Sequence, residues 1–445
     1  MPTALNLKPE QIDTTENRSQ FCVAVLGCEQ KGVFFAVTFA KAGFSVTCLD
    51  ADASVIKKVA KGKIPFSDQE TQSQLKRLIT SGQLIATSEL KTLSKSDIII
   101  ITVPAKVDEK KKTDYSETLN AFKLVGSALH SGSLVIIGET VGFGFIEGTA
   151  KETLENTSGL KAGKDFGLVY MPLFKSSNKN VNPNTNFELI VAAIGKTGLD
   201  AATKIAKTLT SNVKLANEVK TAELATLFRI GKQDANTALA NELAVFCEVT
   251  NSDYFEVLKI LDLNDKEFFP TAVEQENKDS AYFLLENADN INAKLRLSAL
   301  SRQINENMVK HAVNLTQEAL RGCGKTLRRA RVAVLGNVNP ENSTSIYVKL
   351  LTLKGAKISL YDPASKGESL ELNIVKSNLN EALEGADCIV ILTGEQPFSS
   401  LNLKKIKPLT KTPSILVDLA GAYEPEKVKA EGFIYRGIGR GNGKE

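Results

Sequence analysis

The sequence predicts an α/β protein with two Rossmann-like, doubly wound parallel-sheet domains, joined by a helical central domain that contains a long helix. Short apolar runs alternate with helix-length segments toward both ends of the chain, which is typical of parallel sheets covered by helices. Between these regions, residues 221–263 and 295–320 contain few glycines and prolines and show helical periodicity. The expected order is therefore α/β, helical, α/β.

The first α/β region begins with the apolar run VAVL at residues 23–26. A glycine turn follows, then a helical segment that ends at Gly43 and a second strand at residues 45–50. This order predicts a βαβ unit. Further apolar strands are expected at residues 98–103, 133–137 and 166–170.

The same pattern of residues returns toward the C-terminus. The sequence AVLG occurs twice, a glycine precedes an aspartate by seven residues in both regions, and a small residue followed by aspartate introduces an apolar strand in both. Three matches in the same order indicate two domains of one fold. The matching residues are AVLG at 24–27 and 333–336, Gly43 with Asp50 and Gly355 with Asp362, and Ser96-Asp97 and Ala386-Asp387.

These patterns predict four parts of the chain. Residues 1–20 are polar and lack apolar periodicity, which indicates a flexible arm. We expect an N-terminal Rossmann-like domain of the dinucleotide-binding type at residues 21–200. A helical central and dimerisation domain is expected at residues 201–325, and a C-terminal Rossmann-like domain at residues 326–445.

The composition argues against nucleic acid and membranes as partners. The 445 residues carry 55 basic and 51 acidic side chains, a net charge of +4, so no strong attraction to polyanions is expected. We find neither an apolar run long enough to cross a bilayer nor a secretion signal, and we expect a cytoplasmic protein. Small molecules or other proteins are the expected partners.

The cysteines and histidines do not indicate a metal site. Six cysteines are scattered without a CxxC pair, and only His130 and His311 could add imidazole ligands. Cys28 follows a glycine turn, where it is either a redox-sensitive thiol at a helix N-terminus or an ordinary packed side chain. Cys247 lies on an apolar helical face and is either a core residue or a substitute nucleophile.

Several motifs, in order along residues 21–440, resemble the UDP-glucose/GDP-mannose dehydrogenase family, whose members include NAD-dependent UDP-sugar 6-dehydrogenases. The stretch that starts at Asp234 is most similar to the branch that acts on UDP-N-acetylhexosamines. The resemblance implies NAD binding in the N-terminal domain and UDP-sugar binding in the C-terminal domain. The motifs are VAVLG from Val23 with Asp50, SDIIIITVP from Ser96, ETVGFG from Glu139, VYMP from Val169, TAE from Thr221, DANTALANEL from Asp234 and YRGIGR ending at Arg440.

The chemistry implied by this resemblance needs side chains that the sequence lacks. Family members oxidise the primary alcohol on the sixth carbon in two hydride transfers, while a cysteine thiolate holds the intermediate aldehyde. A lysine, an asparagine and a glutamate support oxyanions and proton transfer. Their positions correspond to Thr226, Ile230 and Leu173, and the segment PTAVEQENKD at residues 270–279 contains no cysteine. We therefore expect no catalytic residue.

The nucleotide loop GCEQKG at residues 27–32 has Glu29 where a dinucleotide-binding loop needs its middle glycine. The Glu29 side chain and its charge oppose a pyrophosphate, so weak or negligible NAD binding is expected. Asp50 contacts a ribose or caps the following helix, and Gly32 serves helix packing or phosphate contact. The expected cofactor-side residues are Gly27, Gly32, Asp50 and, by resemblance, Thr140.

The expected substrate-side positions are only partly retained. By resemblance, Asn241 and Arg440 are the expected contacts to a UDP-sugar, whereas Asn241 with Glu242 could instead form a buried polar pair that positions its helix. Lys106 places a cation near the expected cofactor channel. The family's substrate loop aligns with NVNPENSTS at residues 337–345, which departs from it.

We therefore expect a family member that keeps the fold, has lost the oxidation, and acts as a binding or assembly protein in nucleotide-sugar or glycan metabolism. The alternative is an NAD-dependent UDP-sugar dehydrogenase, acting on UDP-glucose or a UDP-N-acetylhexosamine, with rearranged catalysis. A homodimer, or a heteromer with an active relative, is expected through an apolar helical stripe, which could also pack within one chain. The stripe consists of Leu224, Leu227, Leu239, Leu243 and Phe246.

Overall fold

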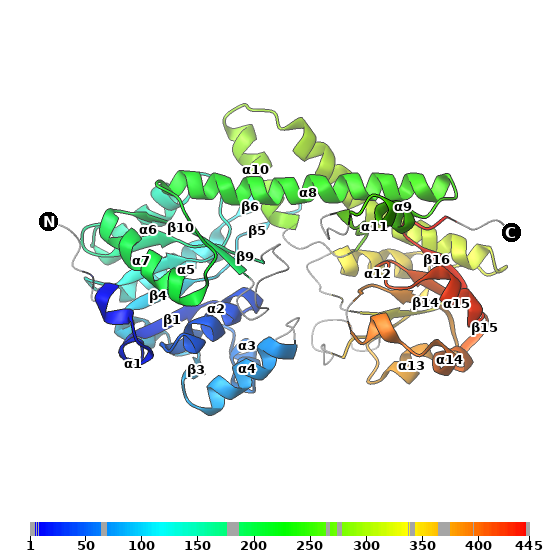
Figure 1. The fold of residues 1–445 in the computed structure, drawn as a ribbon, viewed down its shortest axis with the longest axis horizontal. Coiled ribbons are helices and arrows are strands. Elements are labelled where there is room, and N and C mark those ends of the chain that lie inside the picture. Colours follow the sequence, from blue (N-terminus) through cyan, green and yellow to red (C-terminus); the bar gives the residue numbers. More distant parts are fainter. Residues whose placement is uncertain are drawn as a thin grey trace. The chain divides into compact units, whose positions relative to one another are not determined.

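The computed structural model describes residues 5, 7, 9–63, 69–175, 187–263, 268–273, 278–336, 338, 343–363, 374–394 and 396–441. Contacts divide the chain into two compact units: Met1–Ile230 with Tyr282–Ala293, and Gly231–Ala281 with Lys294–Glu445. Helix α8 (Val219–Val249) crosses the boundary and belongs in part to each unit (Figure 1). The predicted domain boundaries after residues 200 and 325 stay a prediction.

The first unit contains a nine-stranded sheet in the order β11-β10-β8-β7-β4-β1-β2-β3, with β9 paired to β10. From β3 to β8 all neighbours are parallel, and β1 lies between β2 and β4, so the chain reverses its winding direction there. The strands are β1 (Cys22–Leu26), β2 (Ser45–Leu49), β3 (Leu84–Thr87), β4 (Ile98–Ile101), β7 (Leu134–Ile137), β8 (Gly167–Tyr170), β9 (Leu173–Lys175), β10 (Phe187–Ile194) and β11 (Val213–Leu215).

The predicted strands of this unit are confirmed, with one departure at the sheet's far side. Every side chain of β4, β7 and β8 is buried, as expected for strands covered by helices on both faces. β10 is not parallel to its neighbour β8: the two pair antiparallel through residues 192–194 and 168–170. Mixed pairing of this kind is common in large α/β sheets.

Helices cover both faces of the sheet and create two apolar cores. One core includes side chains of α2 and α7, and the other includes side chains of α5 and α6. A short hairpin of β5 (Lys106–Val107) and β6 (Thr113–Asp114) precedes α5. The helices and helical turns are η1 (Pro9–Ile12), α1 (Thr15–Arg18), α2 (Gln30–Lys41), α3 (Ala53–Ala60), α4 (Gln69–Thr80), η2 (Leu90–Lys95), α5 (Ser116–Ala128), η3 (Ile146–Ala150), α6 (Lys151–Ser158) and α7 (Lys196–Leu209).

The expectation of a flexible arm at residues 1–20 does not hold for the described residues of this stretch. Leu7 and Ile12 are buried in the core that also contains α7. Arg18 donates hydrogen bonds to the carbonyl oxygens of Ala42 (2.5 Å) and Ile12 (2.8 Å). Two separated apolar side chains and one arginine are enough to hold the segment, although they leave no periodic pattern.

The second unit contains a five-stranded parallel sheet in the order β13-β12-β14-β15-β16. Helix α11 packs beside α12, where the hydroxyls of Thr316 and Tyr347 lie 2.6 Å apart in the core. The strands are β12 (Arg331–Leu335), β13 (Lys357–Tyr361), β14 (Ala386–Ile391), β15 (Thr410–Asp418) and β16 (Ile434–Gly437).

The predicted helical stretches of the middle of the chain are confirmed as α8 with α9, and as α11. None of the described helices combines the length and apolarity that crossing a membrane requires. The remaining helices and turns are α9 (Tyr254–Ile260), α10 (Lys278–Asn290), α11 (Arg296–Arg321), α12 (Ser343–Leu353), α13 (Leu379–Leu383), η6 (Phe398–Ser400), α14 (Leu403–Ile406), η7 (Lys407–Leu409) and α15 (Pro425–Ala430).

Candidate functional site

The candidate site lies at the carboxyl edge of the first unit's sheet, where β1 ends in the nucleotide loop of residues 27–32. Doubly wound sheets bind nucleotides at this edge, beside the strand at which the winding reverses. Gly27 has φ +97°, and a Cβ there would lie 2.9 Å from the Thr102 carbonyl oxygen. The Thr102 hydroxyl donates to the Gly27 carbonyl oxygen at 2.8 Å, which ties the loop to the end of β4.

Gly32 is required by packing. A Cβ at this position would lie 1.8 Å from the Gly27 carbonyl oxygen and 2.6 Å from the Thr102 Oγ1 atom. No side chain can occupy that space without moving the backbone of the loop. Gly32 therefore serves the contact between α2 and β1, whether or not a phosphate binds nearby.

Glu29 occupies the N-cap position of α2 and is exposed. Its side chain makes no capping hydrogen bond to the helix. The backbone at this residue is extended, with φ −74° and ψ −173°, so the structure does not require glycine there. Any residue can adopt this backbone conformation, so a glutamate here affects ligand binding through its side chain and not through backbone strain.

Asp50 follows β2 and is half-buried beside the loop. Its carboxylate accepts hydrogen bonds from the backbone N–H groups of Cys28 at 2.8 Å and Asp52 at 2.9 Å. Asp52, not Asp50, caps α3, by accepting from the Ser54 N–H at 2.7 Å. The helix-capping alternative for Asp50 is therefore wrong, and its carboxylate joins β2 to the nucleotide loop.

An ion pair that the sequence did not predict lies beside Thr140. Lys31, in the first turn of α2, places its Nζ atom 2.5 Å from the Oε2 atom of Glu139, just past the end of β7. The Glu139 side chain is only 9% exposed, whereas that of Lys31 is 30% exposed. Thr140 is the next residue and is also buried. The only sequence sign of this pair was a lysine at a helix N-terminus, where the helix dipole disfavours a cation.

Glu223, from the TAE motif at the start of α8, organises the loop that follows Thr140. Its carboxylate accepts hydrogen bonds from the N–H groups of Gly144 at 2.6 Å and Ile146 at 2.8 Å. Burial raises the pKa of Glu223 to about 7, against the opposing effect of those two N–H donors. A carboxylate that holds two backbone amides explains this motif residue without catalysis.

The same loop is held from a second side. Tyr115 accepts a hydrogen bond from the Gly142 N–H at 2.9 Å, and Asn287 of α10 accepts one from the Phe143 N–H at 2.7 Å. Burial raises the pKa of Tyr115 to about 12. The loop after β7 is thus fixed by three side chains from α8, α10 and the residue before α5.

The positions expected, by resemblance, to correspond to a lysine, an asparagine and a glutamate hold no ionisable group. Thr226 is fully buried and donates its hydroxyl hydrogen to the Ala222 carbonyl oxygen at 2.9 Å. Ile230 is buried, and Leu173 is half-buried in β9. Tyr170, at the end of β8, is also fully buried, and burial raises the pKa of its phenol.

Three other residues singled out in the sequence are Lys106, Cys247 and Cys28. Lys106 forms an ion pair with Glu117 at 2.9 Å on the surface. Cys247 is buried in the second unit, and burial followed by the charges of Asp253 and Glu248 raises the pKa of its thiol. Cys28 is buried too, and its contact with Cys48 followed by burial raises the pKa of the Cys28 thiol. Neither thiol is activated.

The two expected substrate-side residues belong to polar networks within the second unit. Asn241 is fully buried, donates to the Asn305 Oδ1 atom at 2.9 Å and accepts from the Thr271 N–H at 2.8 Å. Asn305 in turn donates to Asp234 at 2.9 Å. The helix-positioning role of Asn241 therefore has specific partners, although Glu242 is exposed and does not share it.

Arg440 is held within the second unit by an ion pair with Asp253 and by the Phe255 ring, whose centroid lies 4.2 Å from the guanidinium carbon. The neighbouring Gly439 N–H donates to the Glu248 carboxylate at 2.8 Å, and the His311 Nε2 atom lies 2.9 Å from the same carboxylate. These contacts attach the YRGIGR motif to α8 and to the start of α9, and Glu248 also links α8 to α11.

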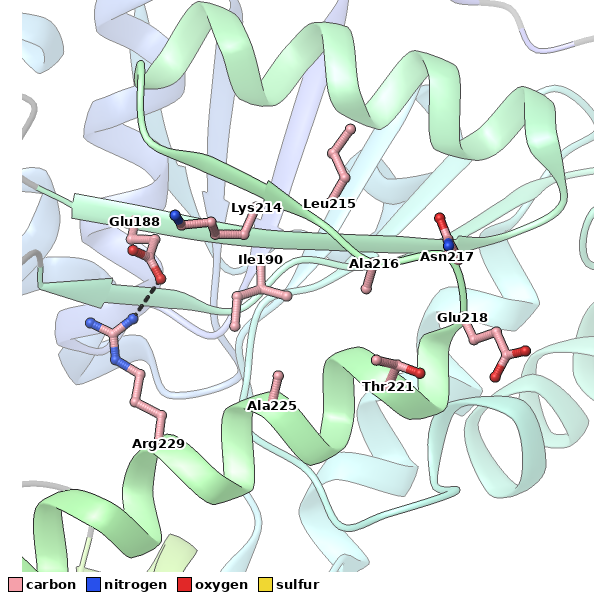
Figure 2. A pocket seen from close by; sticks show the side chains of 10 residues that line it. All are labelled: Glu188, Ile190, Lys214, Leu215, Ala216, Asn217, Glu218, Thr221, Ala225 and Arg229. Carbon is pink, nitrogen blue, oxygen red and sulfur yellow. Dashed lines mark hydrogen bonds and ion pairs between the residues drawn. The ribbon is translucent and has the colours of Figure 1, made fainter.

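A pocket of about 680 Å³ lies elsewhere in the first unit, between β10, β11 and the start of α8 (Figure 2). Glu188 and Arg229 form an ion pair at 2.7 Å at one end of it, and Arg229 also stacks on the Phe174 ring at 4.5 Å. None of the six predicted site residues lines this pocket. The carboxyl edge of the sheet therefore remains the candidate site.

Part of the predicted site falls outside the described residues. These are residues 274–277 of the segment that corresponds to the family's cysteine loop, and residues 337 and 339–342 of the segment that corresponds to its substrate loop. Within the described part of the chain, His, Cys, Asp and Glu side chains do not gather in groups of three or more that could hold a metal ion.

The fold and the edge geometry define a two-unit protein of the dinucleotide-binding type. The chain belongs to the UDP-glucose/GDP-mannose dehydrogenase family: residues 21–212 match its NAD binding domain, and residues 341–425 match its UDP binding domain. The family assignment confirms the resemblance drawn from the motifs.

Named relatives of the chain act on UDP-N-acetylhexosamines. It is 29% identical to UDP-N-acetyl-D-mannosamine dehydrogenase of Pyrococcus horikoshii over 440 residues, which cover 94% of this chain and 99% of that protein. It is 26% identical to UDP-N-acetyl-D-glucosamine 6-dehydrogenase of Pseudomonas aeruginosa, over 91% of this chain and 98% of the relative. The solved structure of the Pyrococcus horikoshii UDP-D-ManNAc dehydrogenase superposes with a TM-score of 0.77, at 27% identity, and covers 95% of this chain and 100% of that one.

Proposed function

We propose that this chain binds a UDP-sugar without oxidising it, and that it acts as a binding or assembly protein in nucleotide-sugar or cell-surface glycan metabolism. The UDP binding domain of its family supports a UDP-sugar as the ligand. The names of its relatives favour a UDP-N-acetylhexosamine over UDP-glucose.

The proposed loss of oxidation activity rests mainly on one observation. The side chain at position 226 is a fully buried threonine whose hydroxyl is bonded to its own helix. It cannot supply the cation that stabilises a developing oxyanion, and Ile230 and Leu173 replace the asparagine and glutamate with alkyl groups. The two oxidation steps would have to proceed without these groups.

The cysteines support the same proposal. A thioester intermediate needs a thiolate, but the structure buries Cys28, Cys48, Cys247 and Cys388, and burial raises the pKa of Cys247 and Cys388. Cys22 is exposed at the start of β1, at the opposite edge of the sheet from the candidate site.

The test measures binding and turnover on the same protein. Calorimetry with UDP-N-acetylglucosamine, UDP-N-acetylmannosamine and UDP-glucose should detect at least one ligand, while NADH formation from the same sugars stays at the level of the protein-free control. Sustained NADH formation would overturn the proposal in favour of a dehydrogenase with rearranged catalysis. If Cys247→Ser abolished that activity, the replacement nucleophile would be identified as well.

The proposal assigns Gly27, Gly32, Asp50 and Thr140 to the nucleotide side, and Asn241 and Arg440 to the UDP-sugar side. NAD binding is proposed to be weak, because the carboxylate of Glu29 lies at the N-terminus of α2, where a pyrophosphate would bind. To bind the ligand, Arg440 would have to exchange its ion pair with Asp253 for a contact with the ligand, because Asp253 already pairs with its guanidinium group.

Assembly is the second part of the proposal. Leu239, Leu243 and Phe246 are exposed on α8 by 45%, 44% and 63%, so they are available to a second copy or to an active relative. Leu227 is fully buried and Leu224 is half-buried, so these two members of the predicted stripe pack within the first unit instead. Sedimentation at micromolar concentrations should show a dimer that Leu243→Glu converts to monomer; a monomeric unmodified protein would remove this part.

A further inference from the structure

We propose that the Lys31–Glu139 ion pair limits the ligand of the nucleotide loop to a nucleoside diphosphate and excludes the second half of a dinucleotide. The inference deepens the proposed function, because it rests on the first unit binding a nucleotide without carrying out oxidation. Two observations support it: the position of the two charged side chains at the end of the sheet, and the burial of the Glu139 side chain.

The ion pair crosses the end of a strand. Lys31 belongs to α2, which follows β1, and Glu139 follows β7. β4 lies between β1 and β7 in the sheet, so the 2.5 Å contact spans the carboxyl end of β4. This end is the place at which a dinucleotide passes from one half of a doubly wound sheet to the other.

The packing below the pair fixes its position. Phe35 lies one helical turn after Lys31, and a Cβ on Gly138 would come within 2.7 Å of the Phe35 ring and 3.2 Å of the Thr102 Cγ2 atom. Helix α2 is therefore pressed against the ends of β4 and β7. This packing favours a change of the Lys31 side-chain rotamer over a shift of the helix as the way to separate Lys31 from Glu139.

Both partners have a physical reason to stay paired. A lysine in the first turn of a helix meets an unfavourable dipole, which an adjacent carboxylate offsets. The Glu139 side chain is 9% exposed, so removing its partner would leave a charge that water reaches poorly. A pyrophosphate or a ribose that displaced Lys31 would offer Glu139 no cation, because the one positive charge of NAD lies farther along the ligand, on the nicotinamide ring.

Asp50 belongs to the other half of the edge. Asp50 is only half-buried, and its carboxylate is oriented by the Cys28 and Asp52 N–H groups at the end of β2. An acidic residue at this position recognises the ribose of the first nucleotide in doubly wound folds. A ribose at Asp50 with a diphosphate at the loop would occupy this half, and the second half of a dinucleotide would have to pass the ion pair.

Calorimetry with ADP and NAD on the full chain tests the inference. The unmodified protein should bind ADP about tenfold more tightly than NAD, or better. Glu29 cannot produce this preference, because its carboxylate repels the more highly charged terminal diphosphate of ADP at least as strongly as the pyrophosphate of NAD. In Glu139→Gln and Lys31→Gln, the ratio should fall to about threefold or less, since either change removes the ionic contact.

Two exposed residues provide matched controls. Lys41→Gln removes a lysine from the last turn of the same helix, and Glu117→Gln removes a carboxylate from the surface pair with Lys106. Both should leave the ADP to NAD ratio unchanged. Glu139→Ala repeats the test without the amide that glutamine could still offer to Lys31.

Three results would overturn the inference. These are NAD binding as tight as ADP binding in the unmodified protein, an unchanged ratio in folded Glu139→Ala and Lys31→Gln, or no binding of ADP at millimolar concentration. A parallel titration with UDP-N-acetylglucosamine separates these results from failure of the proposed function, because that ligand reports on the UDP binding domain rather than on the nucleotide loop.

Discussion

The two Rossmann-like sheets use the same residues for the same backbone contacts. Asp97 accepts a hydrogen bond from the Cys22 N–H at 3.0 Å, and Asp387 accepts one from the Arg331 N–H at 2.9 Å. In both sheets this carboxylate joins the first strand to the strand beside it. The repeat of small residue, aspartate and apolar strand is therefore a structural requirement of each sheet.

The glycines that end the first strands repeat in the same way. Gly27 has φ +97° and leaves room for Thr102, while Gly336 has φ +130° and leaves room for Leu392 and Thr393. Because both sheets share them, these glycines are not by themselves evidence that either sheet binds a nucleotide. The ligand must be inferred from residues that differ between the sheets.

The aspartates after the second strands show such a difference. Asp50 is half-buried beside an open loop, whereas Asp362 is 5% exposed. At the far strands, Asp418 is fully buried and accepts from the Ala420 and Tyr423 N–H groups and from the Tyr435 hydroxyl. The first sheet thus keeps its acidic side chain partly exposed, whereas Asp418 of the second sheet holds the loop that follows it.

The largest effect is expected at the contact between the nucleotide loop and α2. Gly32→Ala should destabilise the first unit by about 3 kcal/mol or more, because the new Cβ meets the Gly27 backbone and no rotamer relieves the clash. Gly148→Ala is the control, since a Cβ there meets no atom within 4 Å. Urea unfolding should separate the two variants; equal stability would show that α2 shifts without cost.

A pH-dependent effect of similar size is expected at Glu223. Its pKa in the folded protein is raised from 4.5 to about 7, so its contribution to stability is present below about pH 4.5 and is lost as pH rises through 7. Relative to Glu223→Gln, the unmodified protein should lose up to about 3 kcal/mol of unfolding free energy over this window. Thermal unfolding across pH measures it, with Glu152→Gln as an exposed control; parallel curves would contradict the burial.

A smaller difference in stability is expected between substitutions of the two repeated aspartates, Asp97 and Asp387. Burial by itself would raise the pKa of Asp387, but the Arg331 N–H, Lys325 and Lys411 outweigh it and lower the pKa. Asp387→Asn should therefore cost about 1 kcal/mol more than Asp97→Asn at neutral pH. The difference should shrink as pH falls below the ordinary value of 3.8, because the lowered pKa stabilises only the ionised form. Hydrogen exchange of the backbone amides in each sheet measures this difference in stability.

The smallest effect is expected at Glu29. Its side chain is exposed, so water screens its repulsion of a pyrophosphate to about 1 kcal/mol, which is about fivefold in affinity. Glu29→Gly should strengthen NAD binding by that factor, and Glu29→Ala should gain less if close approach of the backbone matters more than charge. Tight NAD binding by the unmodified protein, measured by calorimetry, would show that the loop holds a pyrophosphate in another way.

The sequence predicts the strands, the long helices and the internal repeat because burial on both faces of a parallel strand leaves a continuous apolar run. It also predicts that Gly32 serves packing, since the loop lacks its middle glycine. It does not predict the antiparallel β10, because strand direction depends on a connection rather than on the strand's own residues.

The site is less predictable from the sequence than the fold. Lys31 and Glu139 are 108 residues apart, and each alone is compatible with an exposed surface. The role of Glu223 depends on two N–H groups in a distant loop, and that of Arg440 depends on Asp253, the N-cap residue of α9. Such pairs become visible only when the fold brings the strand ends and helix ends together.

The burial of Leu7 and Ile12 ahead of the first strand has a practical consequence for preparing the protein. The match to the family's NAD binding domain begins at residue 21, which suggests a natural place to truncate. A chain shortened to that point would lose Leu7 and Ile12 from the core, at about 2 kcal/mol for each side chain, together with the ion pair between Asp13 and Lys204. It would also uncover Gly43, over which Thr15 packs. Homology marks where the shared sequence begins, but the cooperative folding unit begins earlier.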